Sequence, residues 1–118
     1  MTHERERVAE LLRHIKEAAY DAQNFVEGMS KEDFLSDKRT QQAVIMSLLI
    51  VGEAATKTMD QCPEFVQANA HVPWRNMRGM RNRLAHGCFE INLDVVWETV
   101  QSALPDLLVA LDKVSTQK

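Results

Sequence analysis

Apolar side chains recur every three or four residues through the first quarter of the chain. Such spacing lines one face of an α-helix, and here it predicts a helix from about Arg5 to Glu27. The helix would be about 35 Å long at 1.5 Å per residue. Gly28 follows it in the position that helix ends favour. The stripe consists of Val8, Leu11, Leu12, Ile15, Ala18, Ala19, Ala22, Phe25 and Val26.

A second long helix is predicted from Lys38 to Met59, with Asp37 as its N-cap. Between Ala43 and Ala55 this helix is apolar around most of its circumference, which places it in the middle of a bundle or between subunits. Before it, Ser30 is expected to cap a short turn or helix that continues through Phe34.

The remaining elements also read as helices. Pro63 suits the first turn of a short helix to about Asn69, a further helix runs from Pro73 to about Ala85, and Asn92 caps the last one. Pro105 should kink that last helix near residues 101–104, because proline removes a backbone hydrogen bond. The chain therefore reads as one all-α domain over residues 1–118, an antiparallel bundle of four to five helices.

Composition narrows the function classes. The net charge of −3 on 118 residues is not the footprint of a basic nucleic-acid-binding domain, so any anion site must be local. The longest apolar run, Ala43 to Val51, is too short for the roughly 20 residues that cross a bilayer. The N-terminal residues lack the apolar core of a signal peptide, and a cytoplasmic location is expected. Cys62 and Cys88 then read as free thiols, without zinc-ligand spacing.

The stretch from Trp74 to Cys88 places four arginines and a histidine in fifteen residues of an otherwise acidic chain. Asn82 and His86 are four residues apart and share a helix face. Arg81 lies about 140° around the helix from His86. The two can converge on one ligand only if the helix ends near Ala85 and the chain turns at Gly87, or if a second copy completes the site.

A paired cationic cleft of this kind suits phosphodiester cleavage in RNA. His86 can exchange a proton with the attacking 2′-hydroxyl or the leaving oxygen. Arg81 can bind the phosphate bidentately and stabilise its growing charge, so no metal or other cofactor is required. Asn82 could fix the orientation of the histidine. Three further arginines are candidates for RNA phosphate contacts, or else ordinary surface charges: Arg75, Arg78 and Arg83.

Glu53 is a carboxylate inside the apolar segment of the second long helix. A buried carboxylate without a partner is costly. Two interpretations stay open: Glu53 faces water at the edge of the bundle, or it pairs with one of the arginines of the cationic stretch and supports the site.

The segment from Arg81 to His86, followed by Gly87 and preceded by Pro73-Trp74 and by the Val-Gly-Glu-Ala-Ala segment at 51–55, resembles the HepT-like branch of the HEPN proteins. The resemblance covers nearly the whole chain. It implies an all-helical homodimer whose paired motifs form a metal-independent ribonuclease site, with Arg81 and His86 as the catalytic pair and Asn82 as their polar neighbour. It also implies a prokaryotic toxin whose antitoxin is a small nucleotidyltransferase of the MNT type.

One position departs from the family's pattern. The family often has a tyrosine two residues after the motif histidine, to which the antitoxin attaches AMP groups, and this chain has Cys88 there. Neutralisation by AMP transfer therefore does not carry over with the resemblance, whereas binding of the nucleotidyltransferase over the cleft does.

Three hypotheses follow. The chain is a toxin ribonuclease, or a catalytically silent helical subunit that holds a nucleotide and partners a nucleotidyltransferase, or a helical dimerisation module with surface arginines. Cleavage of RNA in EDTA, lost on changing Arg81 or His86, distinguishes the first from the others. The proposed phosphate contacts carry no base code, so the RNA target cannot be read from them.

Overall fold

The structure, a computed structural model, describes residues 2–87 and 90–114. All regular elements in these ranges are helices, which confirms the all-α prediction. They are α1 (Thr2–Phe25), α2 (Lys31–Leu35), α3 (Lys38–Gln61), α4 (Pro63–Ala68), α5 (Trp74–His86), α6 (Leu93–Glu98), the π-helix η1 (Thr99–Ala103) and α7 (Leu104–Asp112).

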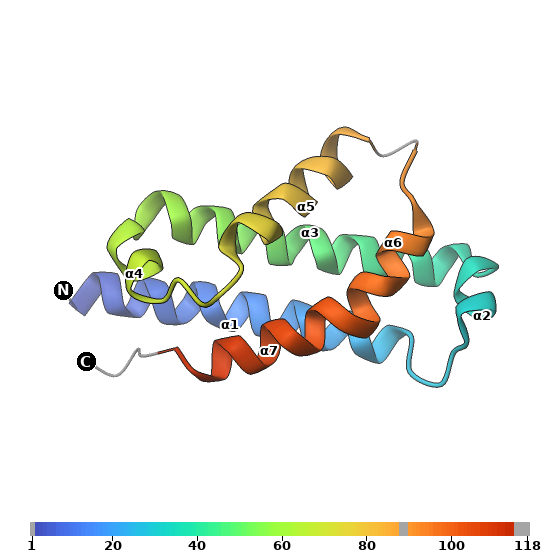
Figure 1. Cartoon of the computed structure of the whole chain (residues 1–118), viewed down its shortest axis with the longest axis horizontal. Helices are drawn as coiled ribbons and strands as arrows, with labels where there is room; N and C mark the ends of the chain where they lie inside the picture. Colours follow the sequence, from blue (N-terminus) through green and yellow to red (C-terminus); the bar gives the residue numbers. More distant parts are fainter. Residues whose placement is uncertain (1, 88–89, 115–118) are drawn as a thin grey trace.

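The two long helices, α1 and α3, run antiparallel and form the body of the bundle (Figure 1). The α6–η1–α7 segment returns along one side of this pair (Figure 1). α5 packs against α3 (Figure 1). The core is built from the predicted N-terminal stripe except Phe25, which is 46% exposed, together with the inner face of α3 and the leucines of α7. None of the helices in the described ranges has the length and hydropathy of a membrane span.

Local hydrogen bonds explain where the helices begin. Asp37 accepts a hydrogen bond from the backbone N–H of Thr40 at 3.2 Å, as an N-cap should. Ser30 and Asp33 form a reciprocal capping box on α2. Asn92 caps α6 through the N–H of the second residue of that helix. The cap predictions for residues 30, 37 and 92 are confirmed.

The irregularity predicted near Pro105 is present, and it takes the form of a π-helix rather than a simple kink. The N–H of Leu104 donates to the carbonyl of Thr99, five residues earlier. A π-turn widens the helix by one residue, and such turns interrupt helices where the regular ladder cannot continue. The missing N–H of Pro105 is accommodated just after it, in the first turn of α7.

Several helix limits differ from the predictions. α1 spans Thr2–Phe25, so it begins earlier and ends earlier than expected, and α3 continues to Gln61. α5 begins at Trp74 and includes His86, one residue beyond the predicted end at Ala85. A shift of this size is common at helix ends, but here it changes the geometry of the site.

α3 is covered on most of its circumference, as the sequence indicated, but one face is not. Met46 is 57% exposed and Ile50 is 42% exposed, and because they are four residues apart they lie on one face of α3. Large apolar residues grouped at the surface often mark an interaction site. This surface, formed by Met46 and Ile50, is the open face of α3.

Candidate functional site

The site begins with an unusually close contact between α3 and α5 at Gly52. A Cβ atom placed on Gly52 would lie 2.3 Å from the Cβ of Arg81 and 2.8 Å from the carbonyl oxygen of Met77. No side chain larger than hydrogen fits there. Gly52 therefore lets the backbone of α5 rest directly on α3, and it fixes the root of the Arg81 side chain against the neighbouring helix.

The Arg81 guanidinium is held by two side chains of α3. Its Nη1 donates to Oε1 of Glu53 at 3.0 Å, and its Nη2 donates to Oγ1 of Thr56 at 3.3 Å. Glu53 is 51% exposed and Arg81 is 26% exposed, whereas Thr56 is buried. Glu53 therefore pairs with an arginine and is also accessible to water at the edge of the bundle, so both interpretations of this residue are correct.

Thr56 was missed by the sequence analysis. It lies three residues after Glu53 and four after Gly52, so the three positions share one face of α3. That spacing is a signal only when another helix is known to pack against the face. Together these residues aim the Arg81 guanidinium along the surface between α3 and α5.

Arg78 is engaged elsewhere. Its Nη2 forms a hydrogen-bonded ion pair with Oδ1 of Asp60, near the end of α3. Sequence reasoning placed Arg78 with two other arginines as a candidate phosphate contact, and the structure separates it from them. To bind RNA, Arg78 would have to give up its carboxylate partner.

His86 occupies the last position of α5 and its side chain is exposed. Because His86 is inside the helix, it stays about 140° around the axis from Arg81. The N–H of Gly87 closes the helix on the carbonyl of Arg83 at 2.9 Å, so the turn at Gly87 comes after His86 and cannot bring it to Arg81. Among the described residues, no hydrogen bond or ion pair joins these two. The predicted route to convergence within a single chain, a helix end near Ala85 followed by a turn at Gly87, is therefore wrong.

Asn82 shares the exposed flank of α5 with His86, as the four-residue spacing predicted. The role suggested for it, to orient the histidine, stays a prediction. Cys88 lies outside the described residues. Cys62 is buried, and burial raises the pKa of its thiol above the ordinary value.

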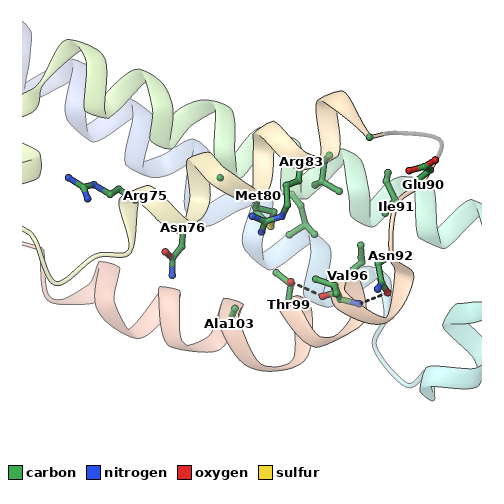
Figure 2. Close-up of a pocket in the computed structure, with 15 residues that line it drawn as sticks. Arg75, Asn76, Met80, Arg83, Glu90, Ile91, Asn92, Val96, Thr99 and Ala103 are labelled. Atoms are coloured by element: carbon green, nitrogen blue, oxygen red, sulfur yellow. Dashed lines mark hydrogen bonds between the residues drawn. The ribbon is translucent and has the colours of Figure 1, made fainter.

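A groove of about 580 Å³ opens on the other flank of α5, between that helix and the α6–η1 segment (Figure 2). Its apolar lining includes Leu48 of α3, Met80 and Leu84 of α5, and Val96 of α6. Arg75 and Arg83 also line the groove, whereas Arg81 and His86 do not. In the described ranges no three histidine, cysteine or carboxylate side chains are grouped as metal ligands would be.

Comparison with known proteins decides the family. The family model described as ribonuclease HepT-like matches residues 15–114, which include α5 and nearly the whole helical bundle. The chain belongs to the ribonuclease HepT-like family. Ribonuclease is accordingly its enzyme class.

Curated relatives agree with this family. A Thermococcus cleftensis protein named "Probable ribonuclease HepT" is 37% identical over 87% of this chain and 91% of its own length. A Methanocaldococcus jannaschii protein that is provisionally named an RNase is 33% identical over 91% of this chain and 86% of its own length. No solved structure matches the chain. The HepT-like assignment therefore rests on sequence, and the site geometry on the present structure.

Proposed function

We propose that this HepT-like ribonuclease is the toxin of a prokaryotic toxin–antitoxin pair. It cleaves RNA without a metal ion, at a site that two copies of the chain build from their Arg81 and His86 side chains. The observation that carries the proposal is the divergence of these residues in one chain. Arg81 is held toward α3, while His86 projects from the exposed end of α5.

The open face of α3 is the surface on which the second copy fits. Ile50 and Met46 precede Glu53 by three and seven residues, so all three lie on one side of the helix. A partner that covers Met46 and Ile50 therefore also reaches the Arg81–Glu53 pair. In a two-fold dimer the same patch on each chain meets its copy, and each α5 approaches the other.

In the proposed reaction the 2′-oxygen attacks the phosphorus and the bond from phosphorus to the 5′-oxygen breaks. One His86 accepts the proton of the 2′-hydroxyl, and the His86 of the second copy donates a proton to the leaving 5′-oxygen. The products are a 2′,3′-cyclic phosphate and a free 5′-hydroxyl. Arg81 binds the phosphate and stabilises the charge that grows on it.

The half-exposed Glu53 is compatible with this role of Arg81. An ion pair so accessible to water contributes little, so an incoming phosphate can displace the carboxylate or share the guanidinium with it. Thr56, buried beneath the guanidinium, keeps the second amino group in place meanwhile. Asn82 stands beside His86 and would limit the rotation of its ring.

The antitoxin is proposed to be a nucleotidyltransferase that covers the cleft. This part rests on what the resemblance to HepT-like proteins implies. Cys88 replaces the tyrosine that accepts AMP in the family's common pattern. Neutralisation of this chain is therefore expected through binding and not through AMP transfer.

The first test is cleavage of RNA in EDTA by the wild type, Arg81→Ala and His86→Ala. The two variants are expected to lose about 100-fold or more in rate, the usual scale of a general acid or base. Arg13→Ala is the matched control, because Arg13 is a surface arginine of α1 that pairs with Glu17 of the same helix. Equal cleavage by all four proteins, or by none, contradicts the proposal.

The second test concerns the dimer. Ile50→Asp places a charge on the open face of α3 and should give a monomer that does not cleave RNA. Val109→Asp, at a similarly exposed apolar residue of α7, is expected to change neither the mass in solution nor the activity. A monomeric Ile50→Asp protein with wild-type activity contradicts a shared site.

A further inference from the structure

The groove between α5 and the α6–η1 segment has no part in the reaction as proposed. α5 packs against α3, and its flank toward α6 and η1 is left open over the length of the groove. Its walls are mainly apolar, and it is bounded by one arginine near each end of α5. A volume of about 580 Å³ falls within the range of sites that hold small ligands.

Three charged residues line the groove, Arg75, Arg83 and Glu90, and Arg83 lies between the other two (Figure 2). Its side chain runs back along α5 toward Met80, whereas Arg75 points away from the groove (Figure 2). A Cβ placed on Gly79 would lie 3.6 Å from Nη1 of Arg83, an ordinary van der Waals distance. The guanidinium therefore lies along the surface of α5 beside Gly79, at the groove wall.

The arginines of α5 differ in their partners. Arg81 is paired with Glu53 and Arg78 with Asp60, but within the described ranges no carboxylate pairs with Arg83. A guanidinium beside apolar walls and without an internal counter-ion is ready for an external anion. Binding at Arg83 breaks no existing ion pair, which distinguishes it from Arg78 and Arg81.

Arg83 is also close to the proposed reaction centre. It precedes His86 by three residues, so the two side chains are neighbours on the surface of α5. A strand whose scissile phosphate is at Arg81 and His86 would cross α5 and reach the groove with its next nucleotide. The ligand that combines an anion with a flat, mostly apolar body is a nucleotide.

We propose that the groove binds one nucleotide of single-stranded RNA next to the cleaved bond, with its phosphate on Arg83 and its base between Met80 and the α6–η1 wall. This inference rests on the proposed ribonuclease reaction and adds a base-binding position to it. The side chains of Asn76 and Thr99 line the same groove and can meet the polar edge of a base. The groove, and not the arginine–histidine pair, is then the source of base preference.

The test fills the groove from both walls. Gly79→Leu and Ala103→Leu each place a side chain into it, and the first also improves helix propensity by about 1 kcal/mol, so loss of fold is not expected. Ala68→Leu, at an exposed position of α4, is the matched control. Affinity is measured by fluorescence anisotropy with labelled, 2′-O-methylated single-stranded RNA, which cannot be cleaved through its 2′-oxygen, and with the same strand carrying abasic positions.

Both filled variants should bind the intact strand about tenfold more weakly, and Ala68→Leu should bind it as the wild type does. The abasic strand should bind the wild type and Ala103→Leu alike, whereas Gly79→Leu also crowds the Arg83 guanidinium and should weaken binding of this strand as well. Arg83→Gln should weaken both strands and reduce the salt dependence of binding by about one phosphate contact. Unchanged affinity in both filled variants, or equal affinity of the wild type for intact and abasic strands, overturns the proposal.

Cleavage by the same proteins separates this inference from the reaction on which it rests. If the wild type cleaves RNA and the filled variants have the same kcat/KM, the ribonuclease site is supported and the nucleotide-binding role of the groove is refuted. If the wild type binds RNA through the groove but does not cleave it, the proposed ribonuclease reaction is refuted. If filling changes only the mass in solution, the groove is a protein interface and the proposal is overturned.

Discussion

Gly52→Ala should destabilise the protein, although the same change inside a helix normally stabilises it. Replacing glycine with alanine in a helix gains about 1 kcal/mol from propensity. At Gly52 the added Cβ would stand 2.3 Å from the Cβ of Arg81, whereas ordinary contacts begin at 3.4 Å. Neither Arg81 Cβ nor the Met77 carbonyl can move without moving α5.

The cost can be estimated from the range for overpacked cores, about 1–3 kcal/mol. Because the obstacle is backbone and a Cβ atom, we expect the upper end of that range and, after the propensity gain, a net loss of about 2 kcal/mol. For a chain of this size that is a fall in Tm of roughly 8 °C. Since α5 carries Arg81, cleavage should also fall, by as much as about 100-fold for a shift of 1 Å.

Gly79→Ala is the matched control, made in the helix that packs on Gly52. The nearest atom to its added Cβ is the flexible end of Arg83 at 3.6 Å, so the propensity gain of about 1 kcal/mol should appear undiminished. Thermal and urea unfolding followed by circular dichroism measure both variants. If Gly52→Ala is as stable as the wild type, the close seating of α5 on α3 is refuted.

Three further outcomes are expected. Glu53→Gln should lower the free energy of unfolding by less than about 1 kcal/mol, because its ion pair with Arg81 is accessible to water, and a double-mutant cycle should show a coupling that shrinks as salt is added. Hydrogen bonds from Thr40 hold the pKa of Asp37 below its ordinary 3.8, so the stabilisation of α3 by this carboxylate is complete above that pH and is lost as the pH falls through the lowered value. The difference in Tm between the wild type and Asp37→Ala should therefore narrow in acid, and a constant difference would speak against this cap. Burial raises the pKa of Cys62, so with the other cysteine changed to serine a thiol reagent should react only after unfolding, and rapid labelling of the native protein would contradict this.

Much of the fold could be predicted because its determinants are local. The caps at Ser30, Asp37 and Asn92 are hydrogen bonds within three residues, and each was found where the pattern placed it. The interruption before Pro105 was also predicted, since proline lacks an N–H whatever surrounds it. The form of the interruption, a π-turn, depends on how α6 and α7 pack and was not predictable from the proline.

The candidate site was predictable in its parts and not in its arrangement. The sequence left open whether Glu53 faces water or pairs with an arginine, and it offered several arginines without distinguishing them. Thr56 gave no separate signal, and the groove beside Arg83 gave none, because its walls come from α3, α5 and α6–η1. The end of α5 was misplaced by one residue, which changed where His86 projects.

The sequence by itself determined that this chain is helical, where the helices capped by Ser30, Asp37 and Asn92 begin, and that a cationic arginine–histidine motif of the HepT-like family lies on one helix. These properties depend on periodicity and on contacts between residues a few positions apart. Only the tertiary structure decided that Gly52 seats α5 on α3, that Arg81 and not Arg78 meets Glu53, and that Arg83 is left facing a groove. Those outcomes depend on contacts between residues far apart in the chain, and such contacts are fixed by the packing of whole helices rather than by the local sequence.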